Sequence, residues 1–552
     1  MTQTVSPLAG RPLLSAMSTR PLAIGSILEH AARAHPRKGV VSREGDGVSR
    51  FSYAELLKRV AKLAHALREL GVQPGDRVAS FAWNGHRHLE LYYAVPMIGA
   101  VLHTVNIRLF PNQVTFILDH AEDRIVFFDT SLTSQVNAFR ALQPDQQRTF
   151  VAMGAAREGV EGALDYETLL AAQPDSYPWP EVDERAAALL CYTSATTGDP
   201  KGVLFSHRST YLHALAAGLP NFVGLHERDR VLPVVPMFHV NAWSFPFLAP
   251  LVGADLILPM ERLDAASLIE LVHDEHVTCA AGVPTVWMAV RDRLHAEGRR
   301  LPELRRVIIG GAAMPKSLFD GLAELGIEAV HAWGMTEMSP IGVINSAASE
   351  LDADPRLQRR ERYKAGRFVP IVEWRLVDEY GADLPADGVS RGELLVRGQA
   401  VTESYFRNEA ATAAAFEPGG WFHTGDVATV DEFGYLDIVD RVKDFIKTGG
   451  EWISSNEVEN VIMGHPAVRE ACVFGLRHPK WQERPVAAVV ARDGQVLTED
   501  ELRTWLADYL AKWQIPDRIF LVDEIPRSGV GKFLKRELRT RYADLFAGES
   551  ET

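Results

Sequence analysis

Hydrophobic and polar positions along this chain follow two alternating spacings. Residues 53–71 (YAELLKRVAKLAHALRELG) carry apolar side chains at intervals of three and four residues, which predicts an amphipathic helix that ends at a glycine. Between such segments, short runs rich in β-branched and aromatic residues predict strands; they lie at 77–83, 124–129, 188–192 and 305–311. Strands and helices that alternate in this way predict α/β layers built on parallel sheets.

The segment 231–260 is apolar over its whole length, as a membrane span would be. Five prolines interrupt it, and each removes a helical donor and clashes with the preceding turn. We therefore predict a buried core segment and no transmembrane helix. The first 25 residues lack a continuous apolar stretch, which argues against a secretory signal, while their Ser and Thr content leaves a transit peptide as an alternative.

The length of 552 residues indicates at least two domains. Near residue 440 the pattern changes to a charged segment followed by a compact run of roughly a hundred residues, and no Gly/Ser-rich linker marks the change. We predict an N-terminal domain of layered sheets and helices over 1–440. A small, mobile α+β C-terminal domain over 441–552 would follow it across a short hinge.

The composition narrows the function classes. Hydrophobic residues make up 47% and charged residues 24% of the chain, as in ordinary globular enzymes. The net charge of −14 disfavours a nucleic-acid partner, so an anionic substrate would need a locally positive site. The three cysteines are far apart in the sequence and support neither a disulfide framework nor a cysteine metal site. We expect a cytoplasmic protein.

A polar segment with phosphate-binding chemistry follows the strand at 188–192. In CYTSATTGDPKG (191–202), hydroxyls, backbone amides and Lys201 can surround phosphate oxygens, and Thr193 can also bind a metal. It is no Walker A loop, because only one glycine precedes the lysine. Taken alone, a polar turn between two strands explains the segment equally well.

Five further motifs occur in order: GGAAMP (310–315), HAWGMTE (331–337), WFHTGD (421–426), DRVKDFIKTGGEWISS (440–455) and IPRSGVGKFLKRELR (525–539). With them, the chain from about residue 25 to residue 540 resembles the adenylate-forming superfamily of acyl-CoA synthetases, luciferases and peptide-synthetase adenylation domains. The segments PMFHVNAW, AGVPTVW, HPKWQERP and AKWQIPD resemble its bacterial medium- and long-chain fatty acyl-CoA synthetases.

The resemblance implies a two-step ligase for a fatty acid or another carboxylic acid. The acid and ATP, with Mg²⁺, would give acyl-AMP and pyrophosphate, and the thiol of coenzyme A would then displace AMP after the small domain rotates. It also implies a homodimer, and it leaves transient membrane contact open. The residues implied to bind ATP and AMP are Thr193, Ser194, Thr196, Thr197, Gly198, Lys201, Gly311, Ala312, His331, Ala332, Trp333, Gly334, Thr336, Asp426, Arg441, Lys443 and Lys532.

The implied nucleotide contacts suit the side-chain chemistry. The carboxylate of Asp426 would accept hydrogen bonds from both ribose hydroxyls. Trp333, where the family more often has Tyr, would stack on adenine. Glu337 would hold Mg²⁺ beside Thr193, because that ion selects hard oxygen ligands. The alternatives without a nucleotide role are that Asp426 is a solvated turn residue, Trp333 a core residue and Glu337 a surface residue.

The other implied roles concern the two half-reactions and the acyl group. Lys532 would bridge the acyl carboxylate and the α-phosphate and stabilise the transition state. Lys443 matches the hinge position and Arg441 would reach the ribose. The residues implied to line the pantetheine passage are Lys447, Gly449, Gly450 and Trp452. Those implied for the acyl group are His239 near the reacting carboxyl, Trp243 as the tunnel gate, and Trp287 and Val283 in the tunnel wall.

One position departs from the family pattern. Ala195 stands where the phosphate loop normally has a second glycine, and if that position needs a positive φ, the methyl group costs about 1 to 2 kcal/mol. A catalytically weak binding protein is therefore one alternative. Others are a ligase for an aryl or short thioether acid, an amino-acid adenylation domain and a light-emitting oxygenase.

Overall fold

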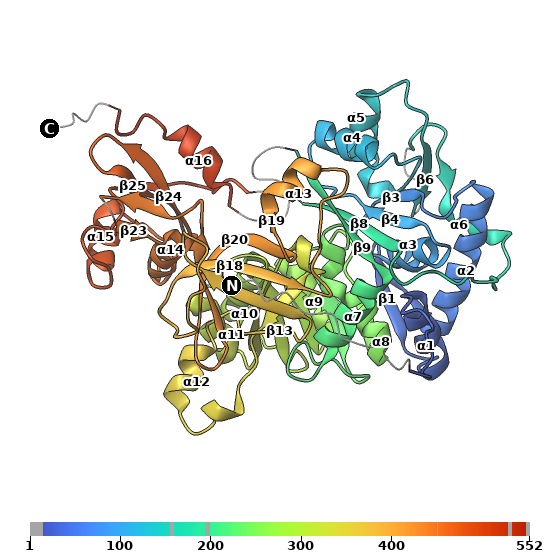
Figure 1. The fold of residues 1–552 in the computed structure, drawn as a ribbon, viewed down its shortest axis with the longest axis horizontal. Coiled ribbons are helices and arrows are strands. Elements are labelled where there is room, and N and C mark those ends of the chain that lie inside the picture. Colours follow the sequence, from blue (N-terminus) through green and yellow to red (C-terminus); the bar gives the residue numbers. More distant parts are fainter. Residues whose placement is uncertain (1–14, 155–158, 194–198, 450, 528–532, 548–552) are drawn as a thin grey trace, which may run out of the picture.

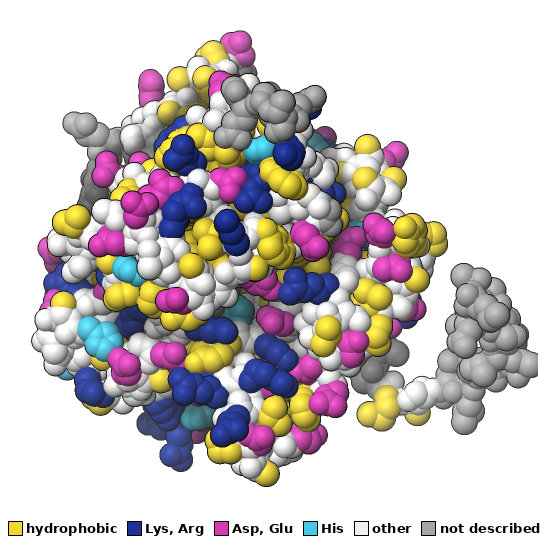
Figure 2. All heavy atoms as spheres, turned by 90° about the vertical axis from the view of Figure 1, so that its left-hand side faces the viewer, with side chains coloured by type: hydrophobic (Ala, Val, Ile, Leu, Met, Phe, Trp, Pro, Cys, Tyr) yellow, Lys and Arg dark blue, Asp and Glu magenta, His cyan; other side chains and the backbone are white. Residues whose placement is uncertain are grey.

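The computed structural model describes residues 15–154, 159–193, 199–449, 451–527 and 533–547. It has a large N-terminal domain and a smaller C-terminal domain. The smaller domain contains β22–β26 and α14–α16, within residues 446–541, and lies at one end of the molecule (Figure 1). The predicted fold class is confirmed in this division and in its mixture of layered sheets and helices. On the face that carries the small domain, acidic and basic side chains are interspersed (Figure 2).

The helix predicted at 53–71 is α2 (Tyr53–Glu69). It begins with a capping box, in which Ser52 Oγ accepts from the Glu55 amide at 3.2 Å and the Glu55 carboxylate accepts from the Ser52 amide at 2.8 Å. Its apolar positions at helical spacing are buried, apart from a half-buried Leu57. Gly71 follows the helix with a φ of +84°, a conformation that glycine adopts without a steric penalty.

The four strands predicted from apolar runs are also present. They are β3 (Arg77–Phe81), β5 (Ile125–Asp129), β8 (Ala187–Thr193) and β13 (Arg306–Gly310). Strand β3 ends two residues earlier than predicted, because a loop and α3 (His86–Met97) follow it directly. All four lie in largely parallel sheets, so the predicted α/β layering is confirmed.

Two sheets form the core of the large domain. One has seven strands and is parallel except for the pair β8–β9; its order is β7 (Leu164–Asp165), β6 (Thr149–Met153), β5, β3, β4 (Val101–Thr104), β8, β9 (Lys201–Ser206). The other has nine strands and antiparallel edges; its order is β16 (Arg367–Phe368), β15 (Ile341–Ile344), β14 (Glu328–Gly334), β13, β12 (Cys279–Gly282), β10 (Arg230–Pro233), β11 (Asp255–Leu258), β1 (Gly39–Glu44), β2 (Gly47–Ser52).

Two further sheets lie toward the C-terminus. An antiparallel sheet closes the large domain with β17 (Val372–Val377), β18 (Gly392–Gly398), β20 (Trp421–Val430), β19 (Phe416–Glu417) and β21 (Leu436–Arg441). The small domain has β23 (Glu451–Ile453), β22 (Ile446–Thr448), β25 (Gln482–Ala491), β24 (Val468–His478) and β26 (Arg518–Leu521). Strand β21 is thus the last element before the predicted hinge.

Helices connect the strands and cover the sheets. Those of the large domain are α1 (Gly25–Ala34), α2, α3 (His86–Met97), α4 (Pro111–His120), α5 (Thr133–Ala141), α6 (Tyr166–Ala171), α7 (His207–Gly218), α8 (Phe245–Val252), α9 (Ala265–Asp274), α10 (Pro284–Glu297), α11 (Lys316–Glu324), α12 (Pro355–Glu361) and α13 (Glu409–Ala415). Those of the small domain are α14 (Ser455–Met463), α15 (Glu499–Ala507) and α16 (Lys535–Arg541).

The apolar segment 231–260 is buried, as predicted. It consists of β10 (Arg230–Pro233), a tight turn, α8 (Phe245–Val252) and β11 (Asp255–Leu258), with Pro246 in the first turn of α8 and Pro250 inside that short helix. Buried tyrosines from neighbouring helices bind its backbone: the Tyr93 hydroxyl donates to the Pro246 carbonyl at 2.8 Å, and that of Tyr53 donates to the Ala254 carbonyl at 2.5 Å. Over the described residues, the structure contains no helix with the length and apolar character needed to span a membrane.

Candidate active site

Three neighbouring parallel strands end at one edge of the nine-stranded sheet. Val283 follows β12, Gly311 follows β13 and Trp333 lies at the end of β14. A Cβ placed on Gly311 would lie 3.5 Å from Val283 Cγ1 and 3.8 Å from Trp243 Cζ2. The predicted acyl-binding and adenine-binding residues therefore meet at this edge, which is where open α/β sheets bind ligands.

Glycines at this edge allow the backbone to pass closely. Gly311 has a φ of +82°, which a residue with a side chain adopts only with strain. A Cβ on Gly310 would lie 2.4 Å from the Ala332 carbonyl oxygen, and one on Gly334 would lie 1.9 Å from that of Pro340. No side chain fits at either position without backbone movement.

Asp426 on β20 is buried and joins two of the predicted nucleotide-binding residues. Trp333 Nε1 donates to its Oδ2 at 2.9 Å, and Arg441 Nε lies 2.5 Å from its Oδ1. A carboxylate has about four acceptor sites, so Asp426 can still accept from ribose hydroxyls. The indole N–H of Trp333 thus fixes one oxygen of this carboxylate.

Glu337 lies in the short 3₁₀ turn Thr336–Met338 after β14 and is buried. Its Oε1 accepts from the Tyr405 hydroxyl at 2.7 Å, and Lys201 Nζ lies 4.8 Å from the centre of the Tyr405 ring. Burial, together with the Glu337 carboxylate, raises the pKa of Tyr405 well above its ordinary value, so the hydroxyl remains a donor. Tyr405 was missed by the sequence analysis, since it lies outside the motifs.

The ends of the predicted phosphate segment are fixed by an antiparallel pair. Thr193, the last residue of β8, lies opposite Lys201, the first residue of β9. The segment therefore connects two neighbouring strands, and Lys201 is directed to the side where Tyr405 and Glu337 lie. The roles of Thr193 and Lys201 in binding phosphate and metal stay predictions.

A left-handed turn carries the predicted gate. Val240, Asn241, Ala242, Trp243 and Ser244 have successive φ values of 48°, 53°, 45°, 53° and 66°. Each non-glycine residue in this region costs about 1 to 2 kcal/mol, so five in a row persist only because surrounding contacts hold them. Residues held in this way are concentrated at functional sites.

Buried hydrogen bonds hold the segment that leads into this turn and the end of the turn itself. Before it, Asn84 donates to the Pro233 and Val235 carbonyls at 2.9 and 2.8 Å. At its end, Ser244 Oγ lies 2.8 Å from His213 Nδ1. Burial lowers the pKa of His213 to about 4, so this imidazole is neutral near pH 7 and adds no charge to the apolar surroundings.

The remaining predicted residues are more scattered. His239 is half-buried and precedes the left-handed turn. The Nδ1 atom of His331 lies 3.2 Å from the Lys364 carbonyl oxygen. Desolvation lowers the pKa of His331 to about 4, so its ring is uncharged near neutral pH and offers no positive charge to a nucleotide. Trp287 is fully buried in a hydrophobic cluster separate from the one that contains Trp243.

Three of the predicted CoA-binding residues, Lys447, Gly449 and Trp452, lie in or next to the paired strands β22 and β23 of the small domain. Lys447 Nζ lies 4.5 Å from the centre of the Trp452 ring, and the Gly449 amide donates to the Trp481 carbonyl at 3.0 Å. The Lys447 amide donates to the Glu483 carboxylate at 3.0 Å, and Trp452 is 47% exposed. These contacts all stay within the small domain.

Several predicted residues lie outside the described part of the chain. They are Ser194, Ala195, Thr196, Thr197, Gly198, Gly450 and Lys532. Their roles therefore stay predictions.

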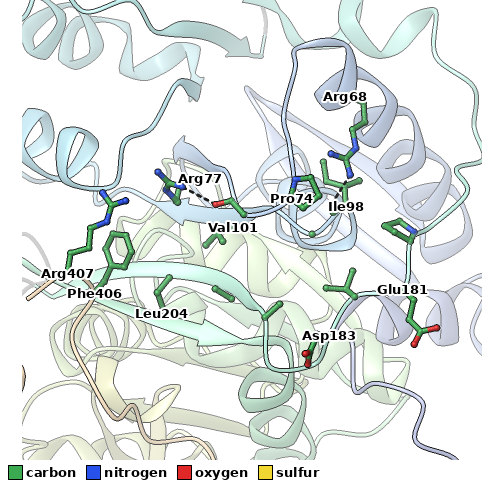
Figure 3. Close-up of a pocket in the computed structure, with 16 residues that line it drawn as sticks. Arg68, Pro74, Arg77, Ile98, Val101, Glu181, Asp183, Leu204, Phe406 and Arg407 are labelled. Atoms are coloured by element: carbon green, nitrogen blue, oxygen red, sulfur yellow. Dashed lines mark hydrogen bonds between the residues drawn. The ribbon is translucent and has the colours of Figure 1, made fainter.

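A cavity of about 490 Å³ lies elsewhere, at the amino ends of β3, β4 and β8. Figure 3 shows Arg77 and Arg407 at one end of it and Val101 and Leu204 along its wall. None of the predicted site residues within the described ranges lines this cavity. It is distinct from the edge where Trp243, Gly311 and Trp333 lie.

Comparisons with known proteins identify the family of this chain. The family model of AMP-binding enzymes matches residues 28–406, and that of the AMP-binding enzyme C-terminal domain matches residues 457–532. The chain belongs to the AMP-binding enzymes.

Relatives of this AMP-binding enzyme include CoA ligases of similar length. A long-chain-fatty-acid–CoA ligase of Thermus thermophilus is 48% identical over 97% of this chain and 98% of its own. A medium-chain-fatty-acid–CoA ligase of Ectopseudomonas oleovorans is 44% identical over 98% and 100%. A 3-methylmercaptopropionyl-CoA ligase of Ruegeria pomeroyi is 44% identical over 97% and 100%.

A solved structure gives the same result for the fold. An anthranilate CoA ligase in complex with anthranoyl-AMP superposes with a TM-score of 0.85 at 25% identity, over 95% of this chain and 98% of that one. The predicted membership of the adenylate-forming superfamily, near the fatty acyl-CoA synthetases, is confirmed, as is the class of AMP-forming acyl-CoA synthetase.

The Trp333–Asp426 contact gives a test of the nucleotide site. Trp333→Phe keeps an aromatic face for adenine but removes the donor to a buried carboxylate, a loss of about 1 to 3 kcal/mol. We expect the KM for ATP to rise roughly tenfold, measured by pyrophosphate release at saturating acid. Trp374→Phe, in a tryptophan that stacks on Phe368, is the matched control and should leave this KM unchanged. Equal effects of the two substitutions would contradict a nucleotide-binding role for Trp333.

Proposed function

We propose that this AMP-binding enzyme is an ATP-dependent fatty acid–CoA ligase for medium to long chains. The reaction converts acid, ATP and coenzyme A into acyl-CoA, AMP and pyrophosphate through an acyl-AMP. One observation carries the proposal: Trp243, in a buried left-handed turn, lies beside Gly311 at the sheet edge where Trp333 and Asp426 lie. An apolar acyl group and a nucleotide can therefore meet there.

The acyl side of the site supports an apolar acid. The segment PMFHVNAW contains no carboxylate, whereas an amino-acid substrate would need one to pair with its amine. Val240, Ala242 and Trp243 are buried together with the apolar start of α8. The names of the Thermus and Ectopseudomonas relatives agree with a fatty acid.

A short thioether acid is the second candidate substrate. It is favoured by the 44% identity to the 3-methylmercaptopropionyl-CoA ligase over nearly the full length of both chains. The two candidates share the nucleotide and CoA chemistry and differ only in what fills the space beside Trp243.

Oxygen donors at the site fit a magnesium ion. Glu337 and Thr193 are hard oxygen ligands, and the Tyr405 hydroxyl fixes one oxygen of the glutamate. In this proposal both residues hold Mg²⁺, which neutralises phosphate charge when bound. Lys201 adds a positive charge near Tyr405.

The small domain serves the two half-reactions in turn. In the proposal residues 1–440 and 441–552 are the two domains, and rotation near Lys443 exchanges Lys532 for the β22–β23 hairpin at the site. Lys532 and Glu337 serve adenylation, with His239 near the reacting carboxyl. Lys447, Gly449, Gly450 and Trp452 then line the path of the CoA thiol. A homodimer and a cytoplasmic location remain predictions.

Pyrophosphate release across a panel of acids tests the activity. With ATP and CoA present, octanoate, decanoate and palmitate should each give pyrophosphate, AMP and the corresponding thioester in equal amounts. 3-Methylmercaptopropionate, benzoate and amino acids should be poorer substrates by about tenfold or more in kcat/KM, because they leave apolar surface exposed to water. A preference for the thioether acid would establish the second candidate. Acid-independent pyrophosphate release, or none, would contradict both.

The proposed gate can be tested separately. Trp243→Ala removes a large apolar side chain beside Gly311 while leaving Asp426 and Glu337 in place. We expect the KM for the acid to rise, or the preferred chain length to shift, by about tenfold, with the KM for ATP within about twofold of wild type. An unchanged profile over the fatty-acid panel would contradict a gate.

Lys532 tests the division between half-reactions. Lys532→Ala should lower acyl-AMP formation from acid and ATP by about two to three orders of magnitude, since one well-placed charge in a water-poor site contributes about 3 to 4 kcal/mol. Conversion of ready-made acyl-AMP and CoA to the thioester should stay within about tenfold of wild type, because it bypasses that barrier. Equal loss of both steps in a folded variant would contradict the proposed role.

A further inference from the structure

A carboxylate of the large domain binds the first turn of a small-domain helix. Asp440 lies in β21, three residues before the predicted hinge at Lys443, and is 1% exposed. Its Oδ2 accepts from the Ser455 amide at 2.6 Å, from Ser455 Oγ at 2.7 Å and from the Asn456 amide at 3.4 Å. Ser455 is the first residue of α14.

This contact is strong on physical grounds. The amides at a helix N-terminus carry partial positive charge and lack intrahelical acceptors, so a carboxylate there is stabilised. Hydrogen bonds to an ionised group are about twice as strong as neutral ones, and burial protects them from water. The adjacent Val439 carbonyl accepts from Ser454 Oγ at 2.9 Å and from Asn456 Nδ2 at 3.3 Å, which extends the contact along β21.

The same cluster reaches the helix that follows Lys532. Lys535, the first residue of α16, donates through Nζ to Ser455 Oγ at 2.5 Å and pairs with the Glu459 carboxylate at 2.9 Å. Lys535 lies three residues after Lys532. Asp440 is therefore connected through one serine hydroxyl to the element that continues from the predicted catalytic lysine.

Two ion pairs that join the large domain to residues beyond the proposed hinge are more exposed. Arg391 pairs with Glu457 at 2.8 Å, and their side chains are 48% and 44% exposed. Arg492 pairs with Asp292 at 2.8 Å, and their side chains are 33% and 37% exposed. Solvent-exposed pairs contribute little to stability. Among these described contacts, the buried one at Asp440 dominates the attachment of α14.

The structure also indicates which half-reaction this arrangement serves. Asp440 precedes the proposed hinge and stays with β21, whereas Ser455 and Lys535 move with the small domain. Rotation near Lys443 must therefore break the Asp440 contacts. In the present arrangement Lys447, Gly449 and Trp452 are exposed to solvent, and the hydrogen bonds and ring contacts described for them are made within the small domain. A hairpin exposed in this way is not inserted into the large-domain site.

We propose that Asp440 is a positioning residue that holds the small domain in the orientation for adenylation and must release α14 before thioester formation. The proposal rests on the two-orientation mechanism of the proposed function. It assigns Asp440 no contact with substrate. It predicts that weakening the contact changes the two half-reactions unequally.

Asp440→Asn tests this, because it keeps the side-chain shape and removes the charge. The rate of acyl-AMP formation from decanoate and ATP, measured by pyrophosphate release, should fall about tenfold. Thioester formation from ready-made decanoyl-AMP and CoA should stay equal to wild type or rise, since the contact no longer opposes rotation. Glu457→Gln, which breaks the exposed pair with Arg391, is the matched control and should change both steps less than about twofold.

A second variant covers the case in which Asp440→Asn folds poorly. Ser455→Ala removes one of the Asp440 hydrogen bonds and the link to Lys535. It should lower the rate of acyl-AMP formation by less than Asp440→Asn does, and it should likewise leave thioester formation from decanoyl-AMP unchanged or faster. Combining the two should add little, because they act on one contact. Equal loss of both half-reactions, or no change in either, in folded variants would overturn the inference. If wild type itself releases no acid-dependent pyrophosphate, the proposed function fails instead.

Discussion

Parallel pairing of β12, β13 and β14 is the constraint on which the candidate site depends. Because the three strands run in one direction, the residues after each strand are brought to one edge although they lie far apart in sequence. Val283, Gly311 and Trp333 meet there for that reason. The antiparallel sheet that follows adds Asp426 from β20, and Trp333 joins the two layers through its indole N–H.

Backbone strain at the acyl side is offset by the same packing. Five consecutive residues from Val240 to Ser244 adopt left-handed φ values, which an isolated chain would not maintain. Asn84, Tyr93 and His213 bind the backbone or side chains around this turn from elements that precede it in sequence. The turn is therefore a property of the assembled domain, and its position beside Gly311 places Trp243 between the apolar core and the nucleotide side.

Charge is arranged locally, against an overall net charge of −14. Asp426 pairs with Arg441, Lys201 lies near the Tyr405 ring that binds Glu337, and Asp440 lies at the N-terminus of α14. Each of these acids is buried and has polar partners, as buried carboxylates require. The overall net charge therefore does not describe the charge around these buried groups.

The sequence by itself determined the layered α/β fold, the helix at 53–71, the buried nature of 231–260 and the motifs that place the chain among the AMP-binding enzymes. These follow from local periodicity, proline sterics and short motifs, which are properties of neighbouring residues. Tertiary structure alone decided the left-handed turn, the Tyr405 contact with Glu337, the Trp333–Asp426 bond and the contact of Asp440 with α14. Each of these joins residues from separate elements, or a backbone conformation that only such contacts stabilise, and residue spacing along a chain does not encode which side chains meet across a core.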